Sequence, residues 1–306
     1  MGIDKLLNDR LLNDRLLNDR LLNDTQGGSS RALDAVARWP VGSAAAGVVR
    51  LSPGPVVDVV EHTGDLDATF PWASVTKLLV AMAVLLATEE GTVALDDGAG
   101  PPGSTVRHLL AHASGLGPDS ERPLTAPGRR RIYSNVGYEV LAASLARRSG
   151  MPFTDYLRAG VVHPLAMTGT ELPAGSSPAS GARGSVRDLL ALAGELLAPR
   201  LVSPATLQRA TSVAFPGLAG VLPGFGRFDP CDWGLGFERR GAKAPHWTGT
   251  RNSPDTFGHF GQSGGFVWVD PRAQVACAAL SDRAFGPWAK AAWPALADAV
   301  IRRWAP

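Results

Sequence analysis

The chain has 306 residues, 45% of them hydrophobic, and a formal net charge of +2. This length and composition are typical of a globular protein with one large domain or two smaller ones. Basic and acidic residues are scattered, so no basic stripe indicates a nucleic-acid partner. The longest apolar run, 78–87, is shorter than the roughly 20 residues that a membrane span requires, so we expect no membrane partner.

The two cysteines, Cys231 and Cys277, form neither a CxxC pair nor a cluster with histidines. They therefore indicate no disulfide framework and no structural zinc site, and we expect no metal and no cofactor. The N-terminus shows no basic start followed by an apolar stretch and a cleavage site. As the sequence stands, we expect a cytoplasmic protein. The alternative is a periplasmic or secreted protein whose export signal was replaced by an engineered N-terminus.

Residues 1–30 form a repeat tract and a linker. The motif LLNDR recurs along 6–24, and Gly-Gly-Ser-Ser follows at 27–30. On an α-helix a step of five residues advances about 140°, so the leucine pairs wind around the axis and form no apolar stripe. We interpret the tract as an engineered tag or a slippage product and exclude it from the fold. The alternative is a natural arm that contacts a neighbouring chain.

The rest of the sequence predicts a hairpin, then helices, then strands. Two β-branched runs within 45–66 flank Ser-Pro-Gly-Pro at 52–55, which is a hairpin signal. Caps, apolar periodicity and terminal glycines predict helices over 74–90, 104–116, 134–150, 184–198 and 203–211. Short apolar runs predict antiparallel strands at 233–240, 264–271 and 275–282, followed by a helical tail at 288–305.

Strand signals therefore lie at both ends of the body and helices lie in its middle. We predict an α/β fold with a mostly antiparallel sheet flanked by N- and C-terminal helices, and with an α-helical insertion domain. The α/β domain would be built from 31–98 and 230–306, and the mainly helical domain from 99–229.

Lysine is rare in this chain, with four lysines against twenty-six arginines, yet one stands at the head of the apolar segment 71–84. If Ser74 opens a helix, Lys77 lies one turn further on and its amine can reach the serine oxygen. A hydroxyl is a weak nucleophile until a base removes its proton, and a lysine desolvated by apolar neighbours is such a base. The alternative is that Ser74 only caps the helix and Lys77 extends to solvent.

A second candidate group is the triplet Tyr133-Ser134-Asn135, on a loop before a predicted helix. A Y-x-N triplet can aim a phenol and an amide into one cleft, as a proton shuttle and a substrate-orienting hydrogen bond. The alternative is that Ser134 or Asn135 caps the helix and Tyr133 packs in the core.

A third candidate group is His259-Phe260-Gly261, which lies among glycines before a predicted strand. Glycines let the backbone approach a ligand closely, and N–H groups beyond Gly261 could face an oxyanion. By contrast, His108 and His112 have the i, i+4 spacing of metal ligands but no third ligand, so we predict a helix-surface or packing role for them.

The ordered motifs S-V-T-K at 74–77, Y-S-N at 133–135 and H-F-G at 259–261 resemble those of the penicillin-recognising serine hydrolases. That group contains class C β-lactamases, DD-peptidases and related esterases. The segments TVRHLLAHASGL and GHFGQSGGFVWVDP are also similar to the family, and the resemblance covers about residues 45 to 285. It implies a β-lactamase/transpeptidase-like fold.

The resemblance also implies three catalytic residues. Ser74 would be the acylated nucleophile, and Lys77 would hold or accept its proton. Tyr133 would act with Lys77 as general base and then give a proton to the leaving group.

Further roles are implied by the same resemblance. Asn135, His259 and Gly261 would contact the substrate, and the backbone amides of Ser74 and Gln262 would form the oxyanion hole.

The third motif departs from the family pattern, because β-lactamases of this family usually have K-T-G where this chain has His259-Phe260-Gly261. Histidine is mostly neutral at pH 7 and phenylalanine offers no hydroxyl, so neither replaces the lysine and threonine that bind a substrate carboxylate. We therefore expect β-lactamase activity to be weak or absent.

The sequence thus predicts a serine hydrolase that cleaves a small-molecule ester or amide through an acyl-enzyme on Ser74. We expect an esterase, because no export signal would bring the chain to peptidoglycan. One alternative is a penicillin-binding DD-carboxypeptidase or D-amino-acid amidase. The other is a non-catalytic relative that binds a ligand in the cleft.

Overall fold

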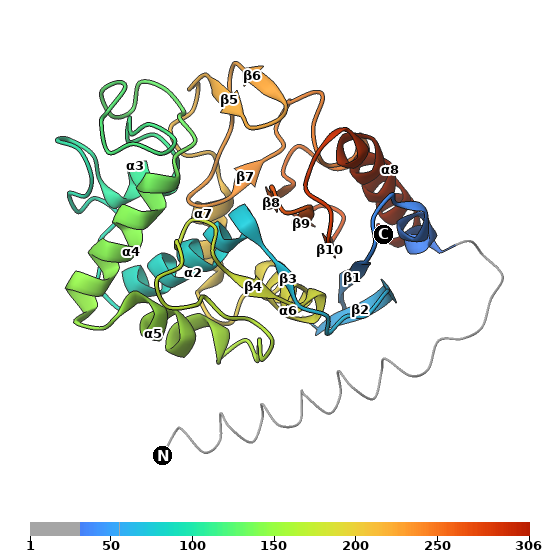
Figure 1. The fold of residues 1–306 in the computed structure, drawn as a ribbon. Helices are drawn as coiled ribbons and strands as arrows, with labels where there is room; N and C mark the ends of the chain where they lie inside the picture. The colour runs from blue at the N-terminus through green and yellow to red at the C-terminus, as the bar shows by residue number, and fades with distance from the viewer. Residues whose placement is uncertain (1–30, 55) are drawn as a thin grey trace, which may run out of the picture.

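The structure is a computed structural model that describes residues 31–54 and 56–306. Within these residues the main sheet has six strands, in the order β2-β1-β10-β9-β8-β7, and all neighbouring pairs are antiparallel. The strands are β1 (Ala44–Ser52), β2 (Val56–Thr63), β7 (Glu238–Arg239), β8 (Phe257–Gly261), β9 (Gly265–Asp270) and β10 (Val275–Ser281). The two ends of the described chain therefore meet in one sheet (Figure 1).

The repeat tract, its expected contact with a neighbouring chain, and Pro55 of the predicted hairpin all lie outside the described residues.

The sheet is buried on both faces, because successive residues of its strands alternate between two apolar cores. On β9, Val267 and Val269 belong to the first core, whereas Phe266 and Trp268 belong to the second. This alternation follows from the two-residue period of a β-strand. The near-continuous apolar runs in the sequence are explained by burial on both sides.

The first core packs α2 (Thr76–Glu89) and α6 (Val186–Leu197) against one face of the sheet. The side chains of α2 are buried from Thr76 to Leu85, as expected of a helix that is apolar around its whole circumference. Helix α6 lies on β1 and β10. Its close approach requires glycine, because a Cβ on Gly47 of β1 would lie 2.5 Å from Leu190 of α6.

The second core lies under α8 (Pro287–Trp304) and the 3₁₀ helix η1 (Ala32–Arg38), on the other face. Trp293 of α8 packs edge-on against Phe266 of β9, with 5.0 Å between ring centroids. The sheet is therefore enclosed by helices from both ends of the described chain.

The remaining helices lie mostly beside α2, on the side of the molecule away from α8 (Figure 1). They are α3 (Val106–Leu110), α4 (Asn135–Ser149), α5 (Phe153–Leu157), the π-helical turn η3 (Arg158–Val162) and α7 (Pro204–Thr211). The side chain of Ser134 caps α4 by accepting from Gly137 N–H, and Gly150 ends the helix with a φ of 70°. The sequence signals for this helix are thus confirmed.

Several short strands have no clear signal in the sequence. They form two-stranded pairs, β3 (Phe70–Pro71) with β4 (Arg183–Gly184) and β5 (Gly220–Leu222) with β6 (Gly226–Phe228). Elements of two or three residues are fixed by tertiary contacts, so sequence periodicity cannot reveal them.

Two strand predictions were wrong in their bounds. Only Glu238–Arg239 of 233–240 is a strand, because Gly234 N–H donates to Phe237 O in a tight turn before it. His259 was expected ahead of a strand, yet it lies inside β8 and pairs with Val267 of β9.

The α/β fold with its antiparallel sheet and flanking helices is confirmed. The division into an α/β domain of 31–98 and 230–306 and a mainly helical domain of 99–229 stays a prediction. Helix α6 lies within 99–229 and yet packs on the sheet. In the described part of the chain, no helix has the length and apolar character needed to cross a bilayer.

A buried charge network joins the edge strand β7 to the loop that follows it. Glu238 accepts hydrogen bonds from Lys243 Nζ at 2.6 Å, from Trp247 Nε1 at 2.9 Å and from His246 Nε2 at 3.0 Å. Burial alone would raise the pKa of the Glu238 carboxyl, but Lys243 and His246 outweigh it and lower the pKa to about 2. The carboxylate is therefore ionised in the folded protein and holds the loop in place.

We predict that Glu238→Gln lowers the free energy of unfolding by about 3–5 kcal/mol, because it leaves the Lys243 ammonium buried without a countercharge. Guanidinium chloride denaturation followed by circular dichroism measures the change. Glu121→Gln, at an exposed carboxylate, is the matched control and should shift stability by less than about 0.5 kcal/mol. Equal stability of the two variants would contradict the importance of the network.

Candidate active site

Ser74 lies at the head of α2, in the 3₁₀ turn η2 (Ala73–Val75) that connects β3 to the helix. The turn is anchored because Trp72 N–H donates to Ala182 O and β3 pairs with β4. Ala73, directly before Ser74, has a φ of 45°, a left-handed conformation that costs about 1–2 kcal/mol for a residue with a Cβ. No side-chain cap begins α2, so the alternative in which Ser74 is only a cap is wrong.

Lys77 lies one turn beyond Ser74 and has three oxygen partners. Its Nζ is 2.7 Å from Asn135 Oδ1, 2.9 Å from Ala179 O and 3.4 Å from Ser74 Oγ. A neutral amine has two N–H donors and one lone pair. The three oxygens can accept the three N–H groups of an ammonium. When the amine is neutral, its two N–H groups can serve Asn135 and Ala179, which leaves its lone pair for the Ser74 hydroxyl proton.

The Lys77 side chain is fully buried, with 0% of the residue exposed, so the alternative in which it extends to solvent is wrong. Burial lowers the pKa of the Lys77 amine to about 7, and the carboxylates of Asp119 and Glu139 oppose this shift only in part. The neutral amine, which is able to accept a proton, is therefore accessible near neutral pH.

Tyr133 covers the same amine, with Lys77 Nζ 4.7 Å from the ring centroid. Burial raises the pKa of the Tyr133 phenol far above its usual range, and a hydrogen bond with Ser74 lowers it only in part. The phenol therefore keeps its proton at neutral pH. Tyr133 thus contacts both Ser74 and Lys77 as a neutral group.

Asn135 is the first residue of α4, and Ser134 before it supplies the cap. The Asn135 side chain is therefore free of the capping role that the sequence left open. Its Oδ1 accepts from Lys77, and its Nδ2 donates to Asp119 Oδ1 at 2.7 Å. Asp119 thereby fixes which end of the amide faces the lysine.

Three aromatic side chains pack around the ring of Tyr133. The ring of Tyr133 lies 4.5 Å from that of His112, 5.9 Å from that of His259 and 6.0 Å from that of Trp233, measured between centroids. All three supporting residues are buried. The phenol is therefore held in one place by packing.

The two histidines of this cluster are neutral and have opposite tautomers. His112 Nδ1 accepts from Ser134 N–H at 3.1 Å, whereas His259 Nδ1 donates to Phe260 O at 2.7 Å. Burial, together with the charge of Lys77, lowers the pKa of His112 well below its usual range and that of His259 to about 3. Neither imidazole carries a positive charge at neutral pH.

Strand β8 brings the third motif against the backbone that precedes Ser74. A Cβ on Gly261 would lie 2.3 Å from Trp72 O, so only glycine fits there. Gln262 follows directly and is anchored because its carbonyl accepts from Phe285 N–H at 2.9 Å. The amide predicted for the oxyanion hole thus belongs to the residue next to this close contact.

The structure therefore gathers the predicted site residues at one place. Lys77 and Tyr133 contact Ser74 directly, Asn135 contacts Lys77, and His259 contacts Tyr133. Gly261 ends the strand beside the Ser74 turn, and Gln262 begins the turn after that strand.

Three contributors were not identified from the sequence. Ala179 offers only a backbone carbonyl, which no residue type reveals. Asp119 orients Asn135, and its place in the turn-forming stretch Gly-Pro-Asp-Ser was the available signal. His112 was predicted on a helix with His108, but α3 ends at Leu110 and His112 has a φ of 54° that turns it beneath Tyr133.

Comparison with known proteins agrees with this geometry. The family model described as Beta-lactamase matches residues 54–301. A solved structure titled as a β-lactamase (Mb2281c) from Mycobacterium bovis is 52% identical, with a TM-score of 0.87, and the match covers 90% of this chain and 100% of that one. EstCE1, titled as a hydrolase with promiscuous acyltransferase activity, shares the fold with a TM-score of 0.70 at 18% identity, over 88% of this chain and 96% of that one.

A curated relative is the D-alanyl-D-alanine-carboxypeptidase/endopeptidase AmpH of Escherichia coli (strain K12), at 29% identity. That match covers 34% of this chain and 37% of AmpH, so this chain spans little more than a third of the relative's length. The family model, by contrast, extends over most of the described chain and includes all three motifs around Ser74. The chain therefore belongs to the β-lactamase family and is one of its serine hydrolases.

Proposed function

We propose that this protein hydrolyses small esters through an acyl-enzyme on Ser74. In the first half-reaction the Ser74 oxygen attacks the ester carbonyl, and the alcohol leaves as the acyl group becomes bonded to the serine. In the second, water attacks the acyl-serine and releases the acid and free Ser74. The contact of Ser74 with a buried lysine and a half-buried tyrosine supports this order of events.

Proton transfer in this mechanism begins at Lys77. The neutral amine accepts the Ser74 proton through the lone pair that its two acceptors, Asn135 and Ala179, leave free. Tyr133 keeps its own proton, so it passes protons between Lys77 and the departing oxygen and does not act as a phenolate base. Backbone amides of Ser74 and Gln262 would stabilise the oxyanion.

We infer an ester substrate from the neutral state of His259. Its Nδ1 proton is committed to Phe260 O, and the low pKa keeps the ring uncharged. A substrate carboxylate, such as that of a penicillin or of a peptide ending in D-alanine, would find no positive charge there. An ester without a carboxylate needs none, so it fits this site better.

A D-alanine-releasing carboxypeptidase or D-amino-acid amidase is the second candidate. It is favoured by the sequence similarity to AmpH, which is named as such a carboxypeptidase. The substrate of a D-aminoacyl amidase can lack a carboxylate, so the charge of His259 does not exclude that reaction. Comparison of esters with D-amino-acid amides therefore separates the two candidates.

The first prediction concerns the nucleophile. Purified protein should hydrolyse p-nitrophenyl butyrate, and Ser74→Ala should lower kcat by about a thousandfold or more, because no other group replaces the attacking oxygen. Ser212→Ala, at an exposed serine at the end of α7, is the matched control and should keep the full rate. Faster turnover of D-alanine p-nitroanilide than of the ester would favour the second candidate, and an unchanged rate in Ser74→Ala would contradict both.

A second prediction concerns pH. Below a midpoint near the Lys77 pKa of about 7, kcat/KM for the ester should fall as pH falls, because the protonated amine cannot accept the Ser74 proton. Above the midpoint the rate should level off, since the raised pKa keeps the Tyr133 phenol protonated. The carboxylate of Asp119 raises the Lys77 pKa, so Asp119→Asn should move the midpoint to lower pH. A flat profile between about pH 5 and pH 9 would contradict Lys77 as the base.

A third prediction concerns the charge at His259. His259→Lys supplies a fixed positive charge and should increase the rate of acylation by benzylpenicillin about tenfold or more. His259→Gln removes the imidazole without adding charge and is the matched control. Stopped-flow or gel-based acylation assays measure the difference. Equal acylation of the two variants would show that this position does not select against carboxylates.

A further inference from the structure

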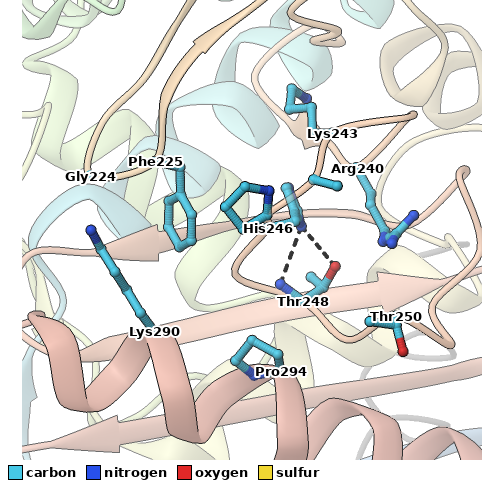
Figure 2. A pocket seen from close by; sticks show the side chains of 11 residues that line it. Gly224, Phe225, Arg240, Lys243, His246, Thr248, Thr250, Lys290 and Pro294 are labelled. Atoms are coloured by element: carbon cyan, nitrogen blue, oxygen red, sulfur yellow. Dashed lines mark hydrogen bonds between the residues drawn. The ribbon is translucent and has the colours of Figure 1, made fainter.

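A cavity lies away from the residues that surround Ser74, where the loop after β7 faces the start of α8 (Figure 2). Its volume is about 430 Å³, and none of the site residues named above lines it. The cavity is lined by Gly224, Phe225, Arg240, Lys243, Ala244, Pro245, His246, Thr248, Thr250, Lys290 and Pro294. No carboxylate is among these lining residues.

Two of the chain's four lysines line this cavity, and only one of them is neutralised. Lys243 forms a buried ion pair with Glu238 at 2.6 Å. Lys290 is exposed on α8, and its Nζ stands over the rings of Phe225 and Phe285, 5.5 and 5.9 Å from their centroids. In the described residues it has no carboxylate within ion-pair distance, so its three N–H donors face the cavity mouth and solvent.

Arg240 also lines the cavity, on the side opposite Lys290 in Figure 2. Its guanidinium donates to the carbonyls of Gly249 and Gly241, and no salt bridge to it is formed within the described part of the chain. Two carboxylates that raise the pKa of Arg240 have other hydrogen-bond donors. Asp298 accepts from the Thr250 hydroxyl and from Arg251 N–H, and Glu238 accepts from Lys243.

Asp270 also influences Arg240, but it is buried and accepts from Ser253 and Thr256. None of these carboxylates lines the cavity, and each accepts hydrogen bonds from groups other than Lys290.

The remaining walls are apolar. Phe225, Pro245 and Pro294 line the cavity. Pro294 lies within α8, and the loop that carries Pro245 is held by the hydrogen bonds of His246 and Trp247 to Glu238. A cavity with apolar walls and a few fixed polar groups is the usual form of a small-molecule site.

We propose that this cavity binds a small organic carboxylate, whose anionic group pairs with Lys290 and whose apolar body lies against Phe225, Pro245 and Pro294. Arg240 and the ion-paired Lys243 also line the cavity, and none of the lining residues carries a carboxylate that could hold a cation there. This site is separate from the hydrolytic centre and does not depend on the proposed esterase activity.

The cavity also shares a wall with the strand of the third motif. The ring of Phe225 packs against Phe260 of β8 and against Phe285, with centroid distances of 5.9 and 5.8 Å. Phe285 in turn is bonded to Gln262 through its backbone N–H. A bound ligand would therefore contact the same aromatic group that supports the third motif.

Isothermal titration calorimetry with phenylbutyrate, performed on the Ser74→Ala protein, tests the proposal. We expect one saturable site, and Lys290→Gln should weaken binding about tenfold or more, because it removes the ammonium that would pair with the ligand's carboxylate. Lys290→Arg keeps the charge and should restore most of the affinity. Arg302→Gln, which removes an exposed cation from the last turn of the same helix, is the matched control and should bind as before.

Two further ligands test separately the anionic group and the apolar body of the proposed ligand. Phenylbutanamide lacks the charge and acetate lacks the apolar body, so each should bind at least about tenfold more weakly than phenylbutyrate. Equal affinity of the Lys290→Gln protein, or absence of saturable binding by phenylbutyrate, would overturn the proposal. Binding of acetate as tightly as phenylbutyrate would also overturn it, since the cavity would then hold any small anion.

Discussion

The chemistry that we propose for this protein depends on one buried amine. Lys77 enters the apolar core with α2, and the loss of water around it lowers its pKa to about 7. The same burial would be costly for a permanent charge, and the site reduces that cost by giving the neutral amine two acceptors and one hydroxyl. The rest of the fold serves this arrangement: the sheet and α6 exclude water, α4 brings Asn135, and the turn before α2 brings Ser74.

The histidines around the Lys77 amine are neutral because they too are buried. A charged imidazole at His112 or His259 would repel the protonated state of Lys77 and lower its pKa further. Both rings instead have a fixed tautomer and pack around Tyr133, whose phenol also stays neutral. Left-handed backbone at Ala73 and His112 adds strain at this site, and the two large apolar cores offset it.

Much of this could be predicted from the sequence because the signals are local. The serine-lysine spacing, the caps at Ser134 and Gly150 and the apolar runs of β9 and β10 each act over a few residues, and the structure has them as expected. Other features depend on the folded chain. The carbonyl of Ala179, the turn of His112 beneath Tyr133, and the strand position of His259 arise from contacts between distant segments, so residue patterns alone do not reveal them.

The most direct test of the central claim is the rate at which a fluorophosphonate modifies the protein, followed by intact mass and peptide mapping. Such reagents bond to activated serines and are not released by water, so they report activation apart from the choice of substrate. If buried Lys77 activates Ser74, one adduct should form on Ser74, and Lys77→Gln should slow its formation by about a thousandfold. Modification at another residue, or an equal rate in Lys77→Gln, would contradict the claim.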